Sequence, residues 1–178
     1  MKRRFTRIIV TMAGIVCLLA GATVVLWLHT FRHYPPKEVM RDVRAGLAAR
    51  HVRDPNQRIE VFLQARYGPL TEATNRERAF LDFFDVNHIK GLNFIVSHTP
   101  APQKAANTQA MADWLAHYRQ TISVQEKEDL RARLNSDAGR AMLRQATAQY
   151  QSQDVYYRAA QQAVIRELMT TLAALRNP

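Results

Sequence analysis

Three side chains in the middle of the sequence have the types and the spacing of a metal site. Asp82, Asp85 and His88 follow one another at intervals of three residues. On a continuous helix this spacing places them on one face, where carboxylates and an imidazole are suitable ligands for a divalent metal. Asp85 is also a good N-cap, and a helix starting there would bend the chain between the outer two ligands. We therefore expect an exposed acidic edge beside a Phe-rich core rather than a metal site.

A second candidate for chemistry is a histidine pair. His29 and His33 are four residues apart, a spacing that suits metal ligation on a helix, and they follow directly after a long apolar segment. Histidines at such a boundary are usually amphipathic surface residues, so we expect no haem or metal there. His51, His98 and His117 have no evident partner in the sequence.

The sequence lacks the short motifs of common enzymes. It contains no His-Glu-x-x-His, Walker A, Gly-x-Ser-x-Gly, Cys-x-x-Cys-His or dinucleotide-binding pattern. Its single cysteine, Cys17, lies inside an apolar segment, where it can form no intramolecular disulfide and is unsuited to be a thiolate nucleophile. We predict no catalytic residue, no metal ligand and no cofactor, and we expect the protein not to be an enzyme.

The segment that determines where all of these side chains lie is the apolar run at residues 8–28. It reads IIVTMAGIVCLLAGATVVLWL, without one acid or base. About 20 apolar residues are the length that an α-helix needs to cross ~30 Å of hydrocarbon. We predict a transmembrane helix over residues 8–28, preceded by a basic cytoplasmic tail at residues 1–7.

The flanking charges give the orientation of this span. Lys2, Arg3, Arg4 and Arg7 cluster directly before it, while the basic residues on the exit side are more dispersed. This arrangement favours a cytoplasmic N-terminus and an extracytoplasmic C-terminal domain at the inner or plasma membrane. The alternative is a cleaved signal peptide, since residues 20–22 (Ala-Gly-Ala) have the small-x-small form of a cleavage site. The apolar run exceeds the ~7 to 15 residues of a usual signal peptide, which favours an anchor.

The expected partners are a lipid bilayer and a membrane or envelope protein. Ala13, Cys17 and Gly21 form a stripe of small residues that would let two copies of the span associate. The formal net charge is +10, but the basic residues are spread along the chain without an aromatic-interleaved patch or a helix-turn-helix pattern. We therefore expect no nucleic-acid binding.

Residues 29–53 are predicted to form a juxtamembrane connector that contains an amphipathic helix. After Pro35-Pro36, an apolar stripe recurs at helical spacing, with arginines outside it. The stripe consists of Val39, Met40, Val43 and Leu47. Directly after a membrane span, the arginines are placed to contact lipid phosphates, but we favour a helix that packs on the domain and leaves its basic face in solvent.

Residues 54–178 are predicted to form a bundle of helices with recognisable ends. The expected signals are the Asp54 cap with Pro55, the Gly68-Pro69 stop, capping boxes at Thr74–Glu77 and Ser123–Glu126, a break at residues 135–137 and a bend at residues 151–154. Met111, Trp114, Leu115, Tyr118 and Ile122 form the clearest apolar seam. No segment alternates as a strand does, so the fold class is all-α, with seven or eight helices after the transmembrane helix.

One part of the chain resembles a known group of proteins. From Ile122 the order is Ser123-x-x-Glu126, Leu130, Leu134 and then Asn135-Ser136-x-x-Gly139-Arg140-Ala141-Met142-Leu143. This order resembles the helical C-terminal half of small bacterial membrane-anchored envelope proteins of unknown function, over roughly a third of the chain. Those proteins usually have Pro after the turn Ser, where this chain has Asp137. The resemblance implies an envelope location and a helical fold, and it carries over no catalytic residue.

Two functional classes follow from the sequence. The first is a membrane-anchored extracytoplasmic helical module that works by protein contact, as a scaffold or as an accessory subunit. The second is a periplasmic sensor or binder of a metal or small ligand, which would use Asp82, Asp85 and His88 or the histidine pair.

Overall fold

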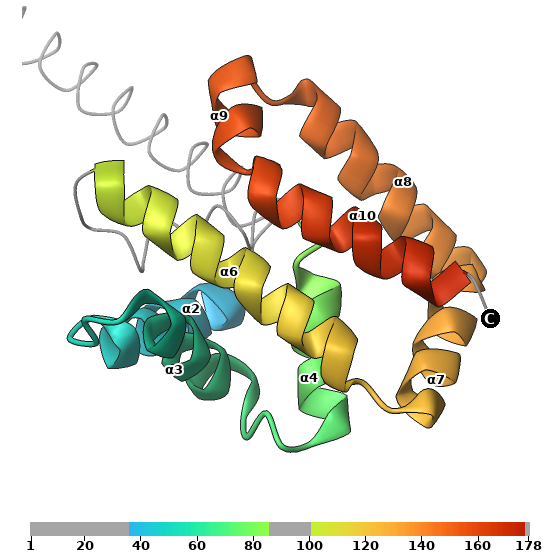
Figure 1. The fold of residues 1–178 in the computed structure, drawn as a ribbon, viewed down its shortest axis with the longest axis horizontal. Helices are drawn as coiled ribbons and strands as arrows, with labels where there is room; N and C mark the ends of the chain where they lie inside the picture. The colour runs from blue at the N-terminus through green and yellow to red at the C-terminus, as the bar shows by residue number, and fades with distance from the viewer. Residues whose placement is uncertain (1–35, 86–100, 177–178) are drawn as a thin grey trace, which may run out of the picture. The chain divides into compact units, whose positions relative to one another are not determined.

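The computed structural model describes residues 36–85 and 101–176, and within these ranges the chain is α-helical without a β-strand (Figure 1). The all-α prediction is confirmed for this part of the chain. Contacts divide the chain into a unit of residues 1–40 and a unit of residues 41–178, and the packing described below belongs to the second. The helices are α2 (Pro36–Ala49), α3 (Pro55–Tyr67), α4 (Ala73–Asp82), α6 (Ala101–Thr121), α7 (Val124–Asn135), α8 (Asp137–Ser152), α9 (Val155–Ala160) and α10 (Gln162–Arg176).

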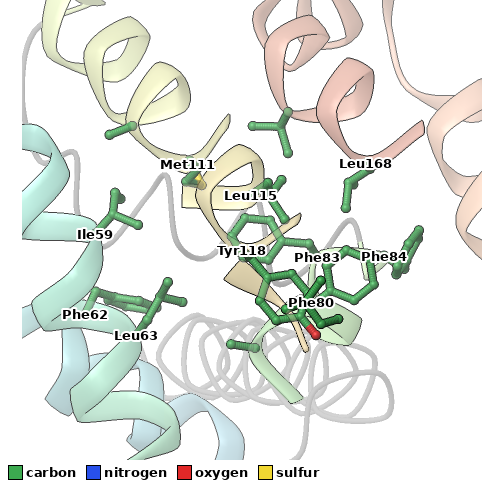
Figure 2. Close-up of a cluster of buried hydrophobic side chains, with 14 of the residues drawn as sticks. Ile59, Phe62, Leu63, Phe80, Phe83, Phe84, Met111, Leu115, Tyr118 and Leu168 are labelled. Atoms are coloured by element: carbon green, nitrogen blue, oxygen red, sulfur yellow. The ribbon is translucent and has the colours of Figure 1, made fainter. Parts of the chain in front are cut away.

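Helix α6 is the centre of the bundle, with α3 and α10 packed against it (Figure 1). Its predicted apolar seam is confirmed, because Met111, Leu115 and Tyr118 are at most 2% exposed. Figure 2 shows these side chains meeting Ile59, Phe62 and Leu63 of α3, the phenylalanines of α4 and its C-terminal turn, and Leu168 of α10. Burial of this apolar surface is the main force that assembles the helices.

Most of the predicted helix ends are confirmed. The Asp54 carboxylate accepts a hydrogen bond from the Gln57 N–H at 2.8 Å, which caps α3, and Gly68 ends that helix with a φ of 99°. At α7 the capping box is complete. The Ser123 hydroxyl accepts from the Glu126 N–H at 3.2 Å, and the Glu126 carboxylate accepts from the Ser123 N–H at 2.9 Å. These local bonds satisfy the free amides of the first helical turns.

The predicted break at residues 135–137 is a tight turn between α7 and α8. The Ser136 hydroxyl accepts a hydrogen bond from the Gly139 N–H at 3.1 Å and so caps α8. A Cβ on Gly139 would lie 2.2 Å from the Arg133 carbonyl oxygen and 2.7 Å from the Leu134 Cα. Only glycine therefore lets the two backbones approach this closely.

Two helix predictions are wrong in detail. The Thr74–Glu77 capping box does not form, because the N-cap of α4 is Glu72, two residues before Thr74, and the helix begins at Ala73. The final helix, predicted to run unbroken from the bend at residues 151–154, is interrupted at Gln161. This residue ends α9 with a φ of −97° and a ψ of 2°, and α10 follows. Neither glycine nor proline marks this second bend.

Within residues 41–178, α2 packs on the bundle and leaves Arg41 and Arg44 exposed, as predicted, but the expectation that its apolar stripe faces inward is wrong. Met40, Val43 and Leu47 are 53%, 39% and 57% exposed. Inside residues 41–178, α2 packs instead through the face that carries Asp42, Ala45 and Ala49, all at most 2% exposed. The reason is an ion pair between Asp42 and Arg66 of α3, in which both side chains are almost fully buried.

None of the helices within residues 36–85 and 101–176 is both long enough and apolar enough to cross a membrane. The predicted basic tail, the span at residues 8–28 and the self-association stripe of Ala13, Cys17 and Gly21 lie outside the described residues. They therefore stay predictions.

Candidate binding pocket

A hollow of about 400 Å³ lies where α3, α4, α6 and the turn between α3 and α4 meet. Helix α6 contributes the largest share of its lining, through side chains spaced three or four residues apart on one face of the helix. The lining residues are Glu60, Gln64, Leu70, Thr71, Arg76, Trp114, His117, Tyr118 and Thr121. The hollow thus combines residues that are up to 61 positions apart in the sequence.

The apolar wall of the hollow is part of a stack of aromatic rings. The Trp114 and Tyr118 rings are nearly parallel, at 3°, with centroids 5.6 Å apart. Phe83 stacks on Trp114 at 5.6 Å, and Phe80 stacks on Tyr118 at 5.1 Å. Parallel stacking of this kind holds large rings rigidly in the core. The rings of this wall are therefore fixed by one another, and Tyr118, at 2% exposed, presents little of its ring to the hollow.

The polar rim of the hollow is largely engaged within the protein. The Arg76 guanidinium donates from Nη1 to the carbonyl oxygens of Leu70 and Thr71, both at 2.9 Å, and from Nη2 to Glu126 at 2.6 Å. Gln64 donates to Glu60 at 3.1 Å. Through these bonds to two carbonyls and a carboxylate, the Arg76 guanidinium links the turn between α3 and α4 to α7. Because its donors are used in this way, it is poorly placed to bind an anionic ligand.

Two ionisable groups beside the hollow, Tyr118 and Glu126, have pKa values that are shifted away from neutral pH. Burial raises the pKa of Tyr118 far above its ordinary value, and the Glu126 and Glu77 carboxylates add to this effect while Arg76 opposes it. Burial alone would also raise the pKa of Glu126. The hydrogen bonds from Ser123 and Arg76 outweigh burial, so the pKa of Glu126 is lowered. Tyr118 is thus a neutral phenol and Glu126 a carboxylate at neutral pH.

The lining of the hollow places no nucleophile beside a base. The only hydroxyls of the lining besides Tyr118 are those of Thr71 and Thr121. Thr121 donates to the His117 carbonyl oxygen at 2.9 Å, so its hydroxyl is directed to the backbone of its own helix. Nucleophilic catalysis requires a hydroxyl within hydrogen-bond reach of a general base. His117 is exposed on the rim and contributes an imidazole that a ligand can reach.

The residues predicted as metal candidates are not brought together in the described part of the chain. Helix α4 ends at Asp82, so Asp85 is not on the same helix. The Asp82 carboxylate accepts a hydrogen bond from the Tyr67 hydroxyl at 2.8 Å. His88, His29 and His33 lie outside the described residues. Among residues 36–85 and 101–176, no three His, Cys, Asp or Glu side chains converge as a metal would require.

Sequence reasoning missed the buried polar groups that join α2, α3 and α6. Arg58 donates to the Val52 carbonyl oxygen at 2.8 Å and to Asn107 of α6 at 3.1 Å, where the bond is buried. Arg66 pairs with Asp42 and also lies over the Tyr67 ring, 5.0 Å from its centroid. Buried charges of this kind are retained only when they are paired or hydrogen-bonded. Their partners lie 24 and 49 residues away, so no local sequence pattern reveals them.

The chain matches no protein-family model, and comparison with curated proteins and with solved structures gave no significant match.

Proposed function

We propose that this protein is a single-pass, membrane-anchored helical module that faces the cell exterior or periplasm and works by protein contact, as a scaffold or accessory subunit without catalysis. The observation that carries the proposal is the run of 21 uncharged residues at positions 8–28, which follows four basic residues. A tether of this kind confines the bundle near other membrane proteins and so raises their effective concentration. Weak contacts are then sufficient for assembly.

The bundle itself supports a contact role. Its core is packed around α6, and polar pairs such as Arg76 with Glu126 and Arg58 with Asn107 link one helix to another. Several large apolar side chains are left on the surface of the second unit. Val155 and Tyr156, at the start of α9, are 62% and 85% exposed. Tyrosine is enriched in protein interfaces because its ring gives a large contact area and its hydroxyl a hydrogen bond.

Site-specific photo-crosslinking in native membranes tests this contact role. A photoreactive phenylalanine analogue at Tyr156 preserves the aromatic ring, and the same analogue at Ala148, an exposed residue of α8, is the matched control. The proposal predicts one discrete adduct at Tyr156 that is absent or much weaker at Ala148. A chain that remains an uncrosslinked monomer from both positions, and also when extracted under several mild conditions, contradicts the proposal.

Binding of a small ligand is the second candidate function, and the hollow of about 400 Å³ beside Trp114 and His117 favours it. The ligand would be a small molecule with a polar group, placed in the hollow so that it contacts Trp114 and reaches His117 on the rim. A screen of such compounds by thermal unfolding tests this candidate. A stabilised melting temperature in the wild type that is lost in His117→Ala supports it, and no shift with any compound removes it.

A further inference from the structure

We infer that the outer face of α2, defined by Val43, Leu47 and Arg44 together with Arg50 just past the end of the helix, lies against the anionic phospholipid surface of the membrane that residues 8–28 are proposed to cross. The inference rests on the proposed anchor. It assigns to α2 a second role, in which the helix orients the bundle on the bilayer.

The rotation of α2 about its axis is fixed by its inner face. Asp42 is 2% exposed and pairs with Arg66, while Ala45 and Ala49 are fully buried. Turning the apolar stripe inward would expose the small residues and separate a buried ion pair, which is strongly unfavourable. The outer face of α2 therefore stays on the surface of the bundle.

The outer face has the composition of a helix that lies at a lipid surface. Val43 and Leu47, together with Met40 one turn earlier, follow one another at three- and four-residue spacing and are 39% to 57% exposed. At 3.6 residues per turn, Arg44 falls beside this line, and Arg50 follows in the turn directly after the last residue of α2; both are exposed. An apolar stripe with basic side chains next to it inserts among acyl chains while the basic groups meet lipid phosphates.

The chain length also places this face close to the bilayer. Seven residues, 29–35, separate the end of the predicted span at Leu28 from the start of α2 at Pro36. A fully extended chain covers at most ~3.3 to 3.6 Å per residue, so this connection spans roughly 25 Å at most. Helix α2 thus begins at most roughly 25 Å from the end of the predicted span, and its exposed stripe has lipid within reach.

The charge of the outer face selects the lipid. Basic residues at a membrane surface are attracted to anionic headgroups, and this attraction weakens with added salt. The apolar stripe alone would bind neutral and anionic bilayers alike. An anionic surface is therefore the occupant that accounts for both the stripe and the arginines.

The test uses the full-length chain reconstituted into vesicles and a polarity-sensitive fluorophore attached at Leu47→Cys in a Cys17→Ser background. Two vesicle compositions are compared, phosphatidylcholine alone and phosphatidylcholine with phosphatidylglycerol. The same fluorophore at Glu128→Cys, an exposed position of α7, is the matched control. Flotation of the vesicles reports anchoring independently of the fluorescence.

We expect the Leu47 label to shift to shorter wavelength on phosphatidylglycerol vesicles, with no shift at Glu128. Arg44→Gln with Arg50→Gln, or high salt, should reverse this shift while the protein still floats with the vesicles. Flotation with a Leu47 label that stays in water overturns the lipid contact and leaves the anchor intact. A shift that depends on protein density but not on phosphatidylglycerol also overturns it, since the face then binds a second copy. Failure to float contradicts the proposed anchor itself.

Discussion

The buried ion pair between Asp42 and Arg66 should be a major contributor to the attachment of α2, and Asp42→Asn is the substitution that tests it. The side chains of the two residues are 3% and 2% exposed, so the arginine that remains is held in a poorly solvated site. The isosteric amide fills the same space but removes the opposite charge. Leaving one buried partner unpaired typically costs about 3 to 5 kcal/mol, a large part of the ~5 to 15 kcal/mol of a small domain.

Urea unfolding of the detergent-solubilised full chain, followed by circular dichroism and tryptophan fluorescence, measures this loss. The matched control is Asp137→Asn, which breaks an Arg–Asp pair with Arg140 whose side chains are 99% and 55% exposed. We expect a clearly lower urea midpoint for Asp42→Asn and little change for Asp137→Asn, because exposed pairs contribute little. Equal midpoints for the two variants would refute the reasoning.

A double variant separates the charge from the packing. Asp42→Leu with Arg66→Met replaces both charges with apolar side chains, an exchange that is often neutral when the site is buried. We expect it to recover most of the stability that Asp42→Asn loses. A double variant as unstable as the single one would show that the hydrogen-bonded geometry of the pair, rather than the uncompensated charge, is what α2 requires.

Three further predictions concern the bundle. Gly139→Ala should cost about 3 kcal/mol through overpacking, because the new Cβ would lie 2.2 Å from a backbone oxygen that cannot move aside. The gain of about 1 kcal/mol in helix propensity leaves a net loss of about 2 kcal/mol in the free energy of unfolding. An unchanged or higher melting temperature in thermal unfolding would rule out this tight turn. Leu115→Ala should lower the free energy of unfolding by about 2 to 5 kcal/mol, because Leu115 is buried, whereas Leu47→Ala at an exposed position should change it by no more than about 0.5 kcal/mol. Similar losses in the two variants would contradict this difference in burial. The pKa of Glu126 is lowered in the folded state, so its contribution to the free energy of unfolding is present above the unfolded-state pKa and is lost as the pH falls through the folded-state pKa. Glu126→Gln should therefore make the stability fall less steeply at acid pH. The same acid dependence in the variant and the wild type would contradict this effect.

Local chemistry explains why most helix ends could be predicted. Asp54, Gly68, Ser123 and Ser136 each make their capping contacts within four residues, so the sequence contains both partners. The bend at Gln161 could not be predicted in this way, since none of its close neighbours is a glycine or a proline. Helix ends can therefore be predicted where a capping side chain or a glycine forms them. They cannot be predicted from the sequence where tertiary packing forms them.

The orientation of α2 shows the limit of helical periodicity. The spacing of Val43 and Leu47 correctly indicates that they share a face of a helix, but it cannot say which face points inward. That choice depends on Asp42 meeting Arg66, which lies 24 residues away. Ala45 therefore packs against the bundle, and the larger Val43 and Leu47, predicted to face inward, lie on the surface.

The candidate pocket could not be predicted from the sequence for a similar reason. Its lining joins Glu60 of α3, Arg76 of α4 and His117 of α6, and no two of these belong to one motif. Only the aromatic seam of Trp114 and Tyr118 could be predicted, and it was assigned to the core. The stack is indeed part of the core, and its open edge forms the wall of the hollow.

The location of the C-terminus tests the membrane-anchored account most directly. Alkaline phosphatase fused after Pro178 becomes active only where its disulfides can form, outside the cytoplasm. The account predicts an active enzyme that sediments with the membrane fraction and resists alkaline extraction. An inactive fusion, or an active one released in soluble form with a new N-terminus at Thr23, would contradict it.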